Sequence, residues 1–213
     1  MIIAIDGPAA AGKGTLARRL AEHFGLAFLD TGLLYRAVGM NMVRGGADLN
    51  DPVLSEAAAK ALTPKDLEAE DLRTDAAADA ASRVSAVPGV RAQLLEFQRH
   101  FAADPPGGAK GTVLDGRDIG TVVCPDADIK LFISAAVEVR AKRRVKELQE
   151  RGLEAIYARV LEDMKERDAR DQARAVSPLE PAKNAYPLDT SELDADQVFD
   201  RVLEYISSRN QEV

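Results

Sequence analysis

A glycine-punctuated loop between a short apolar run and a helical pattern constrains this chain most. The apolar run covers residues 2–5, and the loop after it reads Gly-Pro-Ala-Ala-Ala-Gly-Lys-Gly-Thr over residues 7–15. A strand, such a loop and a helix start form a cradle for phosphate, because the backbone N–H groups of the loop point at the anion. Lys13 is expected to reach the β- and γ-phosphates of a nucleotide, and a hydroxyl after it to approach Mg²⁺. We therefore predict a nucleotide-phosphate site rather than a plain strand-to-helix turn.

The loop departs from the general phosphate-binding pattern at one position. That pattern asks for Ser or Thr directly after the lysine, whereas Gly14 stands there and Thr15 follows it. This variant indicates a particular subfamily. The residues expected to bind the triphosphate are Gly7, Pro8, Ala9, Ala10, Ala11, Gly12, Lys13, Gly14 and Thr15.

The composition is that of an ordinary globular chain. It has 213 residues, 46% of them hydrophobic and 30% charged, which is enough for one sizeable domain. The net charge of −7 argues against a general nucleic-acid or acidic-membrane binder, since both need a basic surface. We therefore expect neither nucleic acid nor a membrane as a partner.

The single cysteine and the N-terminus bear on the compartment. Cys124 stands alone, so we expect no intramolecular disulfide and a small buried hydrophobic role for its thiol. The strand and loop at the N-terminus leave no room for a signal peptide, and no apolar run approaches the ~18 residues that span a bilayer. These features predict a soluble, cytoplasmic protein.

Apolar periodicity predicts alternating strands and helices in the first half of the chain. A helix with Leu16, Leu20 and Phe24 on one face ends at Gly25. A strand over 26–29 and a helix from about 33 to 44 follow. Residues 53–87 are rich in alanine and acidic residues without a strand pattern, which predicts short helices over 53–62 and 75–86 around a loop at 63–74.

A helix that opens at Pro88 is expected to bury Val90, Leu94, Phe97 and Phe101 on one face.

The second half returns to strands. We predict strands over 112–114, 129–133 and 185–188, with a loop or short turn over 120–128. Pro187 fits an edge position in the last strand. A basic helix is expected over about 136–151 and a charged helix over about 153–174. Asp194 is placed to cap the final helix, with Gln197 three residues on.

This alternation predicts an α/β fold with a five-stranded parallel sheet flanked by helices in three layers. Ligands of such sheets bind beyond the carboxyl ends of the strands. The phosphate loop, residues 30–32 and residues 115–118 all follow strand ends and should meet at one cleft.

Arginines from several segments suggest what else this cleft holds. The chain has no Asn-Lys-x-Asp guanine reader, which disfavours a GTPase. A small-molecule kinase must hold two anionic phosphates close together, so it needs converging positive charge. The candidates are Arg36, Arg91, Arg117, Arg140, Arg143, Arg144, Arg167 and Arg174, the last two sharing a helix face with Asp171. The basic helix also fits a solvated surface, but beside a phosphate loop we interpret residues 136–178 as a lid that excludes water.

The aspartates and histidines do not by themselves indicate a metal site or a catalytic role. Asp115 directly follows a buried strand, so it fits either a Mg²⁺ ligand acting through water or a carboxylate that fixes a loop. For Asp6 and Asp30 the structural interpretation is favoured. His23 and His100 are expected on helix surfaces, away from any metal cluster.

Longer stretches of the chain resemble the bacterial cytidylate kinases. The Gly-Lys-Gly-Thr ending of the loop is similar to that of nucleoside monophosphate (NMP) kinases. Residues 30–36 (Asp-Thr-Gly-Leu-Leu-Tyr-Arg), 115–123 (Asp-Gly-Arg-Asp-Ile-Gly-Thr-Val-Val) and 165–179 narrow the resemblance to that family. It covers essentially the whole chain, and its Asp-Gly-Arg-Asp segment is specific.

The resemblance implies transfer of the γ-phosphoryl group of ATP to CMP or dCMP, with Mg²⁺. We expect the chain to be a monomer. The resemblance implies a core over about 1–37, 85–135 and 180–213, an NMP-binding subdomain over 38–84 and the lid over 136–178. Metal contacts are expected from Thr15 and from Asp115 through water. The implied catalytic residues are Lys13, Arg117, Arg140 and Arg144.

The resemblance also assigns the acceptor side. Arg36, Arg117 and Arg174 would hold the acceptor phosphate. Ser82, Arg91 and Asp118 would read cytosine, and Asp171 would meet the sugar hydroxyls. The implied CMP-binding set is Thr31, Arg36, Ser82, Arg91, Arg117, Asp118, Arg167, Asp171 and Arg174.

The chain departs from many relatives between Asp51 and Ser82, where they carry a longer insert with a small sheet. Residues 9–11 are all alanine where Ser or Gly is common, which should matter little because the cradle uses backbone donors. Two other functions stay open: a P-loop kinase acting on UMP, AMP or a metabolite hydroxyl, and a regulatory nucleotide-binding protein without an acceptor.

Overall fold

The computed structural model describes residues 1–210 and has a five-stranded sheet at its centre. The strands are β1 (Ile2–Asp6), β2 (Ala27–Asp30), β3 (Thr112–Gly116), β4 (Ile129–Ser134) and β5 (Tyr186–Asp189). They lie in the order β2-β3-β1-β4-β5, and every neighbouring pair is parallel. The predicted parallel sheet is confirmed, and Pro187 lies in edge strand β5 as expected.

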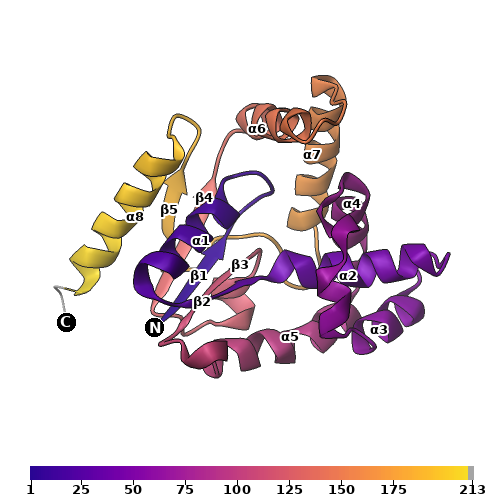
Figure 1. The fold of residues 1–213 in the computed structure, drawn as a ribbon, viewed down its shortest axis with the longest axis horizontal. Coiled ribbons are helices and arrows are strands. Elements are labelled where there is room, and N and C mark those ends of the chain that lie inside the picture. Colours follow the sequence, from indigo (N-terminus) through magenta and orange to yellow (C-terminus); the bar gives the residue numbers. More distant parts are fainter. Residues whose placement is uncertain (211–213) are drawn as a thin grey trace.

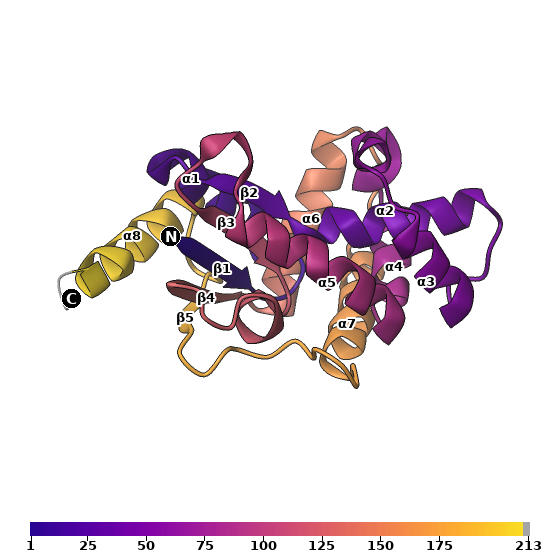
Figure 2. The same cartoon turned by 90° about the horizontal axis from the view of Figure 1, so that it is seen from below.

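Strand alternation sends side chains to two helical layers. Ile3 and Ile5 of β1 pack with the apolar faces of α1 (Lys13–Phe24) and α8 (Ala195–Asn210). Ala4 and Leu114 pack on the opposite face with α5 (Pro88–Ala103) and a short turn over Ile119–Val123. Figure 1 shows α1 and α8 on one side of the sheet, and Figure 2, seen from below, shows α5 crossing the other. The sheet is therefore covered on both faces, as predicted.

A second apolar cluster lies beside the sheet. It joins α2 (Thr31–Arg44), α3 (Pro52–Lys60), α4 (Asp75–Val84) and the start of α5. The helices α2 and α4 pack so closely that a Cβ on Gly39 would lie 2.7 Å from the Cβ of Ala80. The predicted loop over 63–74 contains two 3₁₀ turns, Pro64–Glu68 and Glu70–Arg73.

Two helices that cross one another stand over the carboxyl ends of the strands (Figure 1). They are α6 (Val137–Glu150) and α7 (Tyr157–Gln172), and we call them the α6–α7 hairpin. The charged helix is shorter than the predicted 153–174, because residues 151–156 form the turn between the helices and Gln172 ends the second one.

One sequence prediction about the fold is wrong. Phe97 is 46% exposed, because the inner face of α5 runs through Val90, Leu94 and Gln98. A search for apolar residues alone misses Gln98, whose amide is buried and donates to the Leu94 carbonyl at 3.0 Å. The loop or short turn predicted after Asp118 is confirmed, and it opens with a single π-helical turn over Ile119–Val123.

Other local predictions are confirmed. Asp194 and Gln197 form the expected reciprocal cap at the start of α8. Gly25 ends α1 in the left-handed conformation, and Cys124 is buried. No helix within residues 1–210 combines the length and the apolar character needed to cross a membrane.

Candidate functional site

The phosphate loop joins β1 to α1 and depends on two glycines. Gly7 has φ +145°, and a Cβ there would lie 1.9 Å from the Ile133 carbonyl oxygen, so the loop passes too close to β4 for any side chain. Gly12 has φ +95° and caps α1 at its N-terminus. The first turn of α1 carries no acidic residue, so its free N–H groups and positive helix end face the cleft uncompensated.

Lys13 opens α1 and is buried at the base of this loop. Its Nζ donates to the Pro8 carbonyl at 2.8 Å and lies 3.7 Å from Asp115 Oδ1 at the end of β3. Burial, and then the charge of Arg117, lower the pKa of Lys13 to about 8. Burial raises the pKa of Asp115, against the opposing charge of Lys13. The pair places a cation and a carboxylate beside the loop, as a nucleotide and its metal require.

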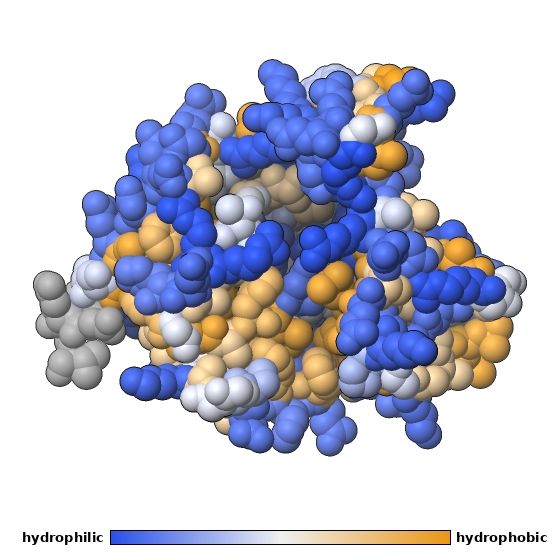
Figure 3. Space-filling model, in the orientation of Figure 1, coloured by the Kyte–Doolittle hydropathy of each residue, from blue (hydrophilic) through white to orange (hydrophobic). Residues whose placement is uncertain are grey.

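A cleft of about 1410 Å³ extends from the loop to the helices α2, α4 and α7. The space-filling view shows the molecule hollowed beneath the α6–α7 hairpin, with hydrophilic side chains gathered around the rim (Figure 3). Most of the predicted site residues line the cleft: Ala9, Ala10, Gly12, Lys13, Gly14, Thr15, Thr31, Arg36, Ser82, Arg91, Asp115, Arg117, Asp118, Arg144, Arg167, Asp171 and Arg174. Gly7, Pro8, Ala11 and Arg140 are not among its lining residues.

Arginines converge opposite Lys13, around one buried carboxylate. Asp171 accepts from Arg117 Nε at 3.0 Å and from Arg174. Burial opposes its ionisation, but the charges of Arg117 and Arg174 hold the pKa of Asp171 below its ordinary value. One carboxylate therefore serves two cations, which leaves an excess of positive charge.

Two further arginines strengthen this excess. Arg36 donates only to the Leu72 carbonyl, at 3.3 Å, and forms no ion pair within residues 1–210. Arg167 makes neither a hydrogen bond nor an ion pair with any described residue, and its Nε is buried. Burial and then the charge of Arg117 lower the pKa of Arg167 to about 10. Half-buried cations without a paired carboxylate are the arrangement expected where a multiply charged anion binds.

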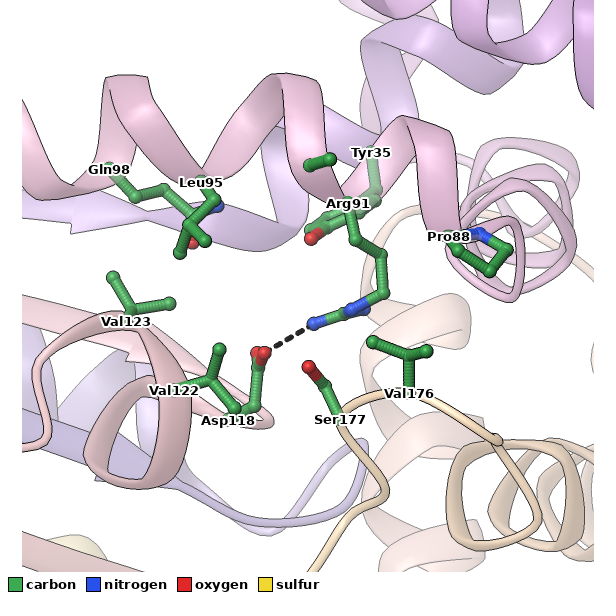
Figure 4. A pocket seen from close by; sticks show the side chains of 11 residues that line it. Tyr35, Pro88, Arg91, Leu95, Gln98, Asp118, Val122, Val123, Val176 and Ser177 are labelled. Carbon is green, nitrogen blue, oxygen red and sulfur yellow. Dashed lines mark hydrogen bonds and ion pairs between the residues drawn. The ribbon is translucent and has the colours of Figure 1, made fainter.

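The far end of the cleft holds a buried ion pair. Arg91 of α5 donates to Asp118 Oδ2 at 2.5 Å, and the Arg91 guanidinium lies 5.3 Å from the centre of the Tyr35 ring. Figure 4 shows Arg91 reaching down from α5 to Asp118 beside a second, smaller cavity of about 160 Å³. Ser82 of α4 is 2% exposed and lines the large cleft one helical turn before Ser85, whose carbonyl accepts from Arg91 at 3.3 Å. A carboxylate, a guanidinium and a hydroxyl together can recognise a polar ring through both its donors and its acceptors.

The hairpin arginines divide into two kinds. Arg144 lines the cleft and pairs with Asp75 of α4 and with Glu147. Arg140 instead pairs with Asp168 of α7 at 2.6 Å and donates to the carbonyls of Ala135 and Ala9. In this structure Arg140 therefore joins the two helices and the phosphate loop, whereas Arg144 faces the space between hairpin and α4.

The structural interpretation of Asp6 is supported. Its two carboxylate oxygens accept from the backbone N–H groups of Ile119 and Gly120, both at 2.8 Å. Burial raises the pKa of Asp6 to about 7, against the pull of those two hydrogen bonds. The carboxylate fixes the turn that begins at Asp118, so it connects the end of β1 to the far end of the cleft.

Some residues of the cleft were missed from the sequence. Arg18, Arg73, Arg151 and Arg170 also line it. For Arg170 the signal was available, because positions 167, 170 and 174 follow helical spacing and share one face of α7.

The donor set fits a magnesium ion carried by a nucleotide. Thr15 and Asp115 offer a hydroxyl and a carboxylate beside Lys13, which are oxygen ligands of the kind Mg²⁺ prefers. Among residues 1–210 no group of three or more His, Cys, Asp or Glu could hold a metal ion alone. His23 and His100 are exposed, as predicted.

Comparisons with known proteins place this geometry in a family. A family model described as cytidylate kinase matches residues 3–208. A cytidylate kinase from Paramagnetospirillum magneticum is 66% identical over 208 residues, covering 98% of both chains. Another from Rhodospirillum rubrum is 56% identical over 211 residues, covering 99% of both.

Among solved structures, the fold is similar to shikimate kinase from Bacteroides thetaiotaomicron, with a TM-score of 0.52, 14% identity and coverage of 97% of this chain and 98% of that one. At that identity the likeness concerns the fold alone, and it agrees with the parallel sheet and phosphate loop. The match over residues 3–208 and the identity of two relatives along their whole length decide the assignment: this chain belongs to the cytidylate kinase family.

Proposed function

We propose that this chain transfers the γ-phosphoryl group of ATP to CMP or dCMP, giving ADP and CDP or dCDP. One observation carries the proposal. A single cleft joins the phosphate loop around Lys13, the cations Arg36 and Arg167, which form no ion pair within residues 1–210, and the Arg91–Asp118 pair, with Ser82 also lining it. This order matches a triphosphate, a second phosphate and a base, laid end to end.

The donor side binds and orients the triphosphate. The loop supplies backbone N–H groups, and Lys13 supplies a cation for the β- and γ-phosphates. Thr15 and Asp115 are the residues that would hold Mg²⁺, Asp115 through water. When bound, Mg²⁺ neutralises charge on the β- and γ-phosphate oxygens.

The acceptor side places the nucleophile. Arg36, Arg117 and Arg174 would hold the phosphate of the monophosphate, with Thr31 and Arg167 beside it, and Asp171 would meet the sugar hydroxyls. Asp118 accepts from the 4-amino group of cytosine, while Arg91 donates to its ring acceptors. Uracil presents an acceptor at position 4, where cytosine presents its amino donor. It would therefore face the acceptor Asp118 with a second acceptor, and such a mismatched buried polar pair costs about 1–3 kcal/mol.

The reaction itself needs positioning rather than a strong base. A loose phosphoryl transition state spreads negative charge over its oxygens, which positive groups stabilise. Arg117 and Arg144 line the cleft where that charge would form, and Arg140 anchors the hairpin that covers it. Closure of the α6–α7 hairpin, the lid in this proposal, would exclude water and so prevent hydrolysis of ATP. In this division the lid spans about 136–178 and the NMP-binding part about 38–84, with the remaining residues as core.

An acceptor panel tests the proposal. ADP release would be measured by a coupled assay with ATP, Mg²⁺ and, one at a time, CMP, dCMP, UMP, AMP and GMP. We expect CMP or dCMP to give the highest kcat/KM. A preference for UMP or AMP would move the chain to another NMP kinase activity. Nucleotide binding without ADP release to any acceptor would indicate a regulatory protein instead.

We also propose that the chain acts as a monomer in the cytoplasm, where ATP and nucleoside monophosphates occur together. The whole cleft is built from one chain, so no second subunit is needed to complete it. Light scattering of the protein eluting from a sizing column should give a mass near 22.9 kDa. A mass of twice that value or more would contradict the monomer.

A further inference from the structure

A single arginine of the α6–α7 hairpin contacts two residues of α4 inside the cleft. Arg170 Nε donates to the Ser82 hydroxyl oxygen at 3.2 Å. Its Nη2 lies 2.9 Å from Asp79 Oδ1, one helical turn before Ser82. Residues 170 and 82 are 88 positions apart, so this contact exists only when the hairpin and α4 lie side by side. All three residues line the cleft.

The two contacts differ in environment. The ion pair is open to solvent, since the side chains of Arg170 and Asp79 are 38% and 51% exposed. Exposed pairs contribute little to stability and are screened by salt. Ser82, in contrast, is 2% exposed and lines the cleft one helical turn before Ser85, whose carbonyl accepts from Arg91 of the Arg91–Asp118 pair. Of the two, the contact with Ser82 is the one that can affect a ligand.

The hydrogen bond sets what the hydroxyl can offer. A serine hydroxyl has one proton to donate and two lone pairs to accept with, and its hydrogen rotates freely until a partner fixes it. Arg170 occupies one lone pair with a charged N–H donor, which is stronger than a neutral one. In the part of the chain that the structure describes, Ser82 Oγ makes no other hydrogen bond. Its proton and one lone pair thus remain for a ligand, in a direction that Arg170 determines.

Other arginines of the hairpin or next to it contact α4 or the residues that flank it. Arg174 donates to the Ser85 hydroxyl at 2.8 Å, Arg144 pairs with Asp75, and Arg151 donates to the Arg73 carbonyl. Arg174 and Arg144 already have roles on the acceptor phosphate and the transferring group. Arg170 is the member of this group that touches a residue assigned to the base.

We propose that Arg170 is a positioning residue that fixes the Ser82 hydroxyl toward the acceptor base and so links the placement of the lid to the occupancy of the base site. The inference rests on the proposed function, because it takes Ser82 as a base contact. A nucleoside monophosphate that engages Ser82 then favours the arrangement in which α7 lies against α4. Arg170 acts through Ser82 and contacts no reacting atom.

A double-mutant cycle tests this link. The four proteins are the natural chain, Ser82→Ala, Arg170→Ala and the double variant, compared by kcat and KM for the acceptor and for ATP. We expect Arg170→Ala to raise the acceptor KM by about tenfold, the effect of one charge-assisted hydrogen bond. The KM for ATP should stay within about twofold. Because both residues act through one hydroxyl, the double variant should be no worse than Ser82→Ala by more than about twofold. If the increases in acceptor KM of the two single variants multiplied in the double variant, the proposal would be overturned. An unchanged acceptor KM in Arg170→Ala would also overturn it.

Two further variants separate positioning from simple structure. Arg83→Ala is a matched control, since Arg83 adjoins Ser82 on α4, its side chain is 34% exposed, and it pairs with Asp48 outside the cleft. It should behave like the natural chain. Asp79→Asn breaks the exposed ion pair but keeps the donor to Ser82, so its acceptor KM should change less than about twofold. If Asp79→Asn matched Arg170→Ala, the ion pair would be the operative contact and the proposal would be wrong.

The acceptor panel keeps this inference distinct from the proposed function. If the natural chain used UMP or AMP instead of CMP, the cytidylate assignment would fail, and the cycle would be run with the acceptor that the chain does use. Coupling between Arg170 and Ser82 would still support the link. A chain with no acceptor at all would overturn both proposals.

Discussion

Lys13 is a residue only 5% exposed, and its ammonium group lies between a carbonyl and a carboxylate. With a pKa of about 8, it is mostly charged at neutral pH and loses its charge more than two pH units earlier than an ordinary lysine, whose pKa is about 10.5. A bound triphosphate favours the charged form, so it raises this pKa. Binding must therefore take up a proton wherever the free protein has lost it, and the affinity for ATP must fall as pH rises through 8.

The first prediction concerns how ATP binding depends on pH. The dissociation constant of a non-hydrolysable ATP analogue with Mg²⁺ should rise above pH 8, toward tenfold per pH unit. Calorimetry in two buffers of different ionisation enthalpy should show up to one proton taken up per nucleotide at pH 9, and far less at pH 7. Lys13→Arg, whose charge does not titrate in this range, should lose the extra uptake. An affinity independent of pH between 7 and 9.5 would show that Lys13 does not meet the phosphates.

Asp118 supports a second prediction. Asp118→Asn keeps the shape of the side chain but removes the charge that Arg91 faces at 2.5 Å and the acceptor proposed for the 4-amino group of cytosine. We expect the KM for CMP to rise at least about tenfold while the KM for ATP stays within about twofold. Asp126→Asn, at an exposed aspartate outside the cleft, is the control. An unchanged KM for CMP would remove Asp118 from base recognition.

At the scale of elements, the sequence was most informative where local patterns decide structure. The strands, the caps at Gly25 and Asp194 and the cradle all follow from residues close together in the chain. Local patterns say less where distant segments decide the structure. Phe97 is exposed because the packing of α5 selects a face that includes Gln98, and the π-helical turn after Asp118 is fixed by Asp6, more than a hundred residues earlier.

For the candidate site, too, the sequence predicts which residues belong to it but not how they pair. Its members could be named from motifs, and the structure brings most of them to one cleft. Which arginine pairs with which carboxylate could not be predicted, because it depends on how the α6–α7 hairpin lies on α4. Arg140 is the clearest case: its partner Asp168 is set by the packing of two helices, not by spacing within either of them.

The two hairpin arginines give a third prediction. Arg140→Ala should lower both kcat and stability, because it leaves Asp168 without its partner in a pair whose arginine is 5% exposed. Breaking a buried pair costs about 3–5 kcal/mol, which corresponds to a fall in Tm of about 6–20 °C for a chain of this length. Arg144→Ala should lower kcat with Tm within about 2 °C, since its partners Asp75 and Glu147 are exposed.

Thermal unfolding and coupled assays on the same preparations would check this contrast. A loss of kcat in Arg140→Ala without a loss of Tm would assign Arg140 to the transferring phosphoryl group alone. Equal losses of Tm in both variants would mean that Arg144 also holds the hairpin in place.

At the scale of the whole molecule, the cleft is lined by the sheet with its phosphate loop, by the helices α2 and α4, and by the α6–α7 hairpin. Bound ligands should hold these three parts together. A ligand at a hundred times its dissociation constant stabilises the folded state by about 2.7 kcal/mol, or about 5–11 °C in Tm for a chain of this length. We expect CMP alone and an ATP analogue with Mg²⁺ each to raise Tm in a thermal shift assay. Together they should raise it further.

Removal of magnesium gives a related prediction. EDTA should abolish ADP release, because charge on the triphosphate is then not neutralised. It should leave the Tm increase caused by CMP almost unchanged, since the acceptor side uses arginines rather than a metal. Activity should return with excess Mg²⁺. Turnover that survives EDTA, or a CMP effect that disappears with it, would contradict this division between the two halves of the cleft.

The pairing of β1 with β3 has a consequence for how such a chain can change over generations. Ile5 lies opposite Asp115 and Asp6 opposite Gly116, so the donor loop and the loop that carries Arg117 leave the sheet at the same level. Neighbouring strands lie about 4.8 Å apart, a spacing set by backbone hydrogen bonds and not by side chains. Substitutions of side chains therefore change the distance between the two phosphate-holding loops little. Variation can accumulate in α2–α4 and in α6–α7, altering which acceptor is taken and how the cleft closes, while the gap that the phosphoryl group must cross stays the same.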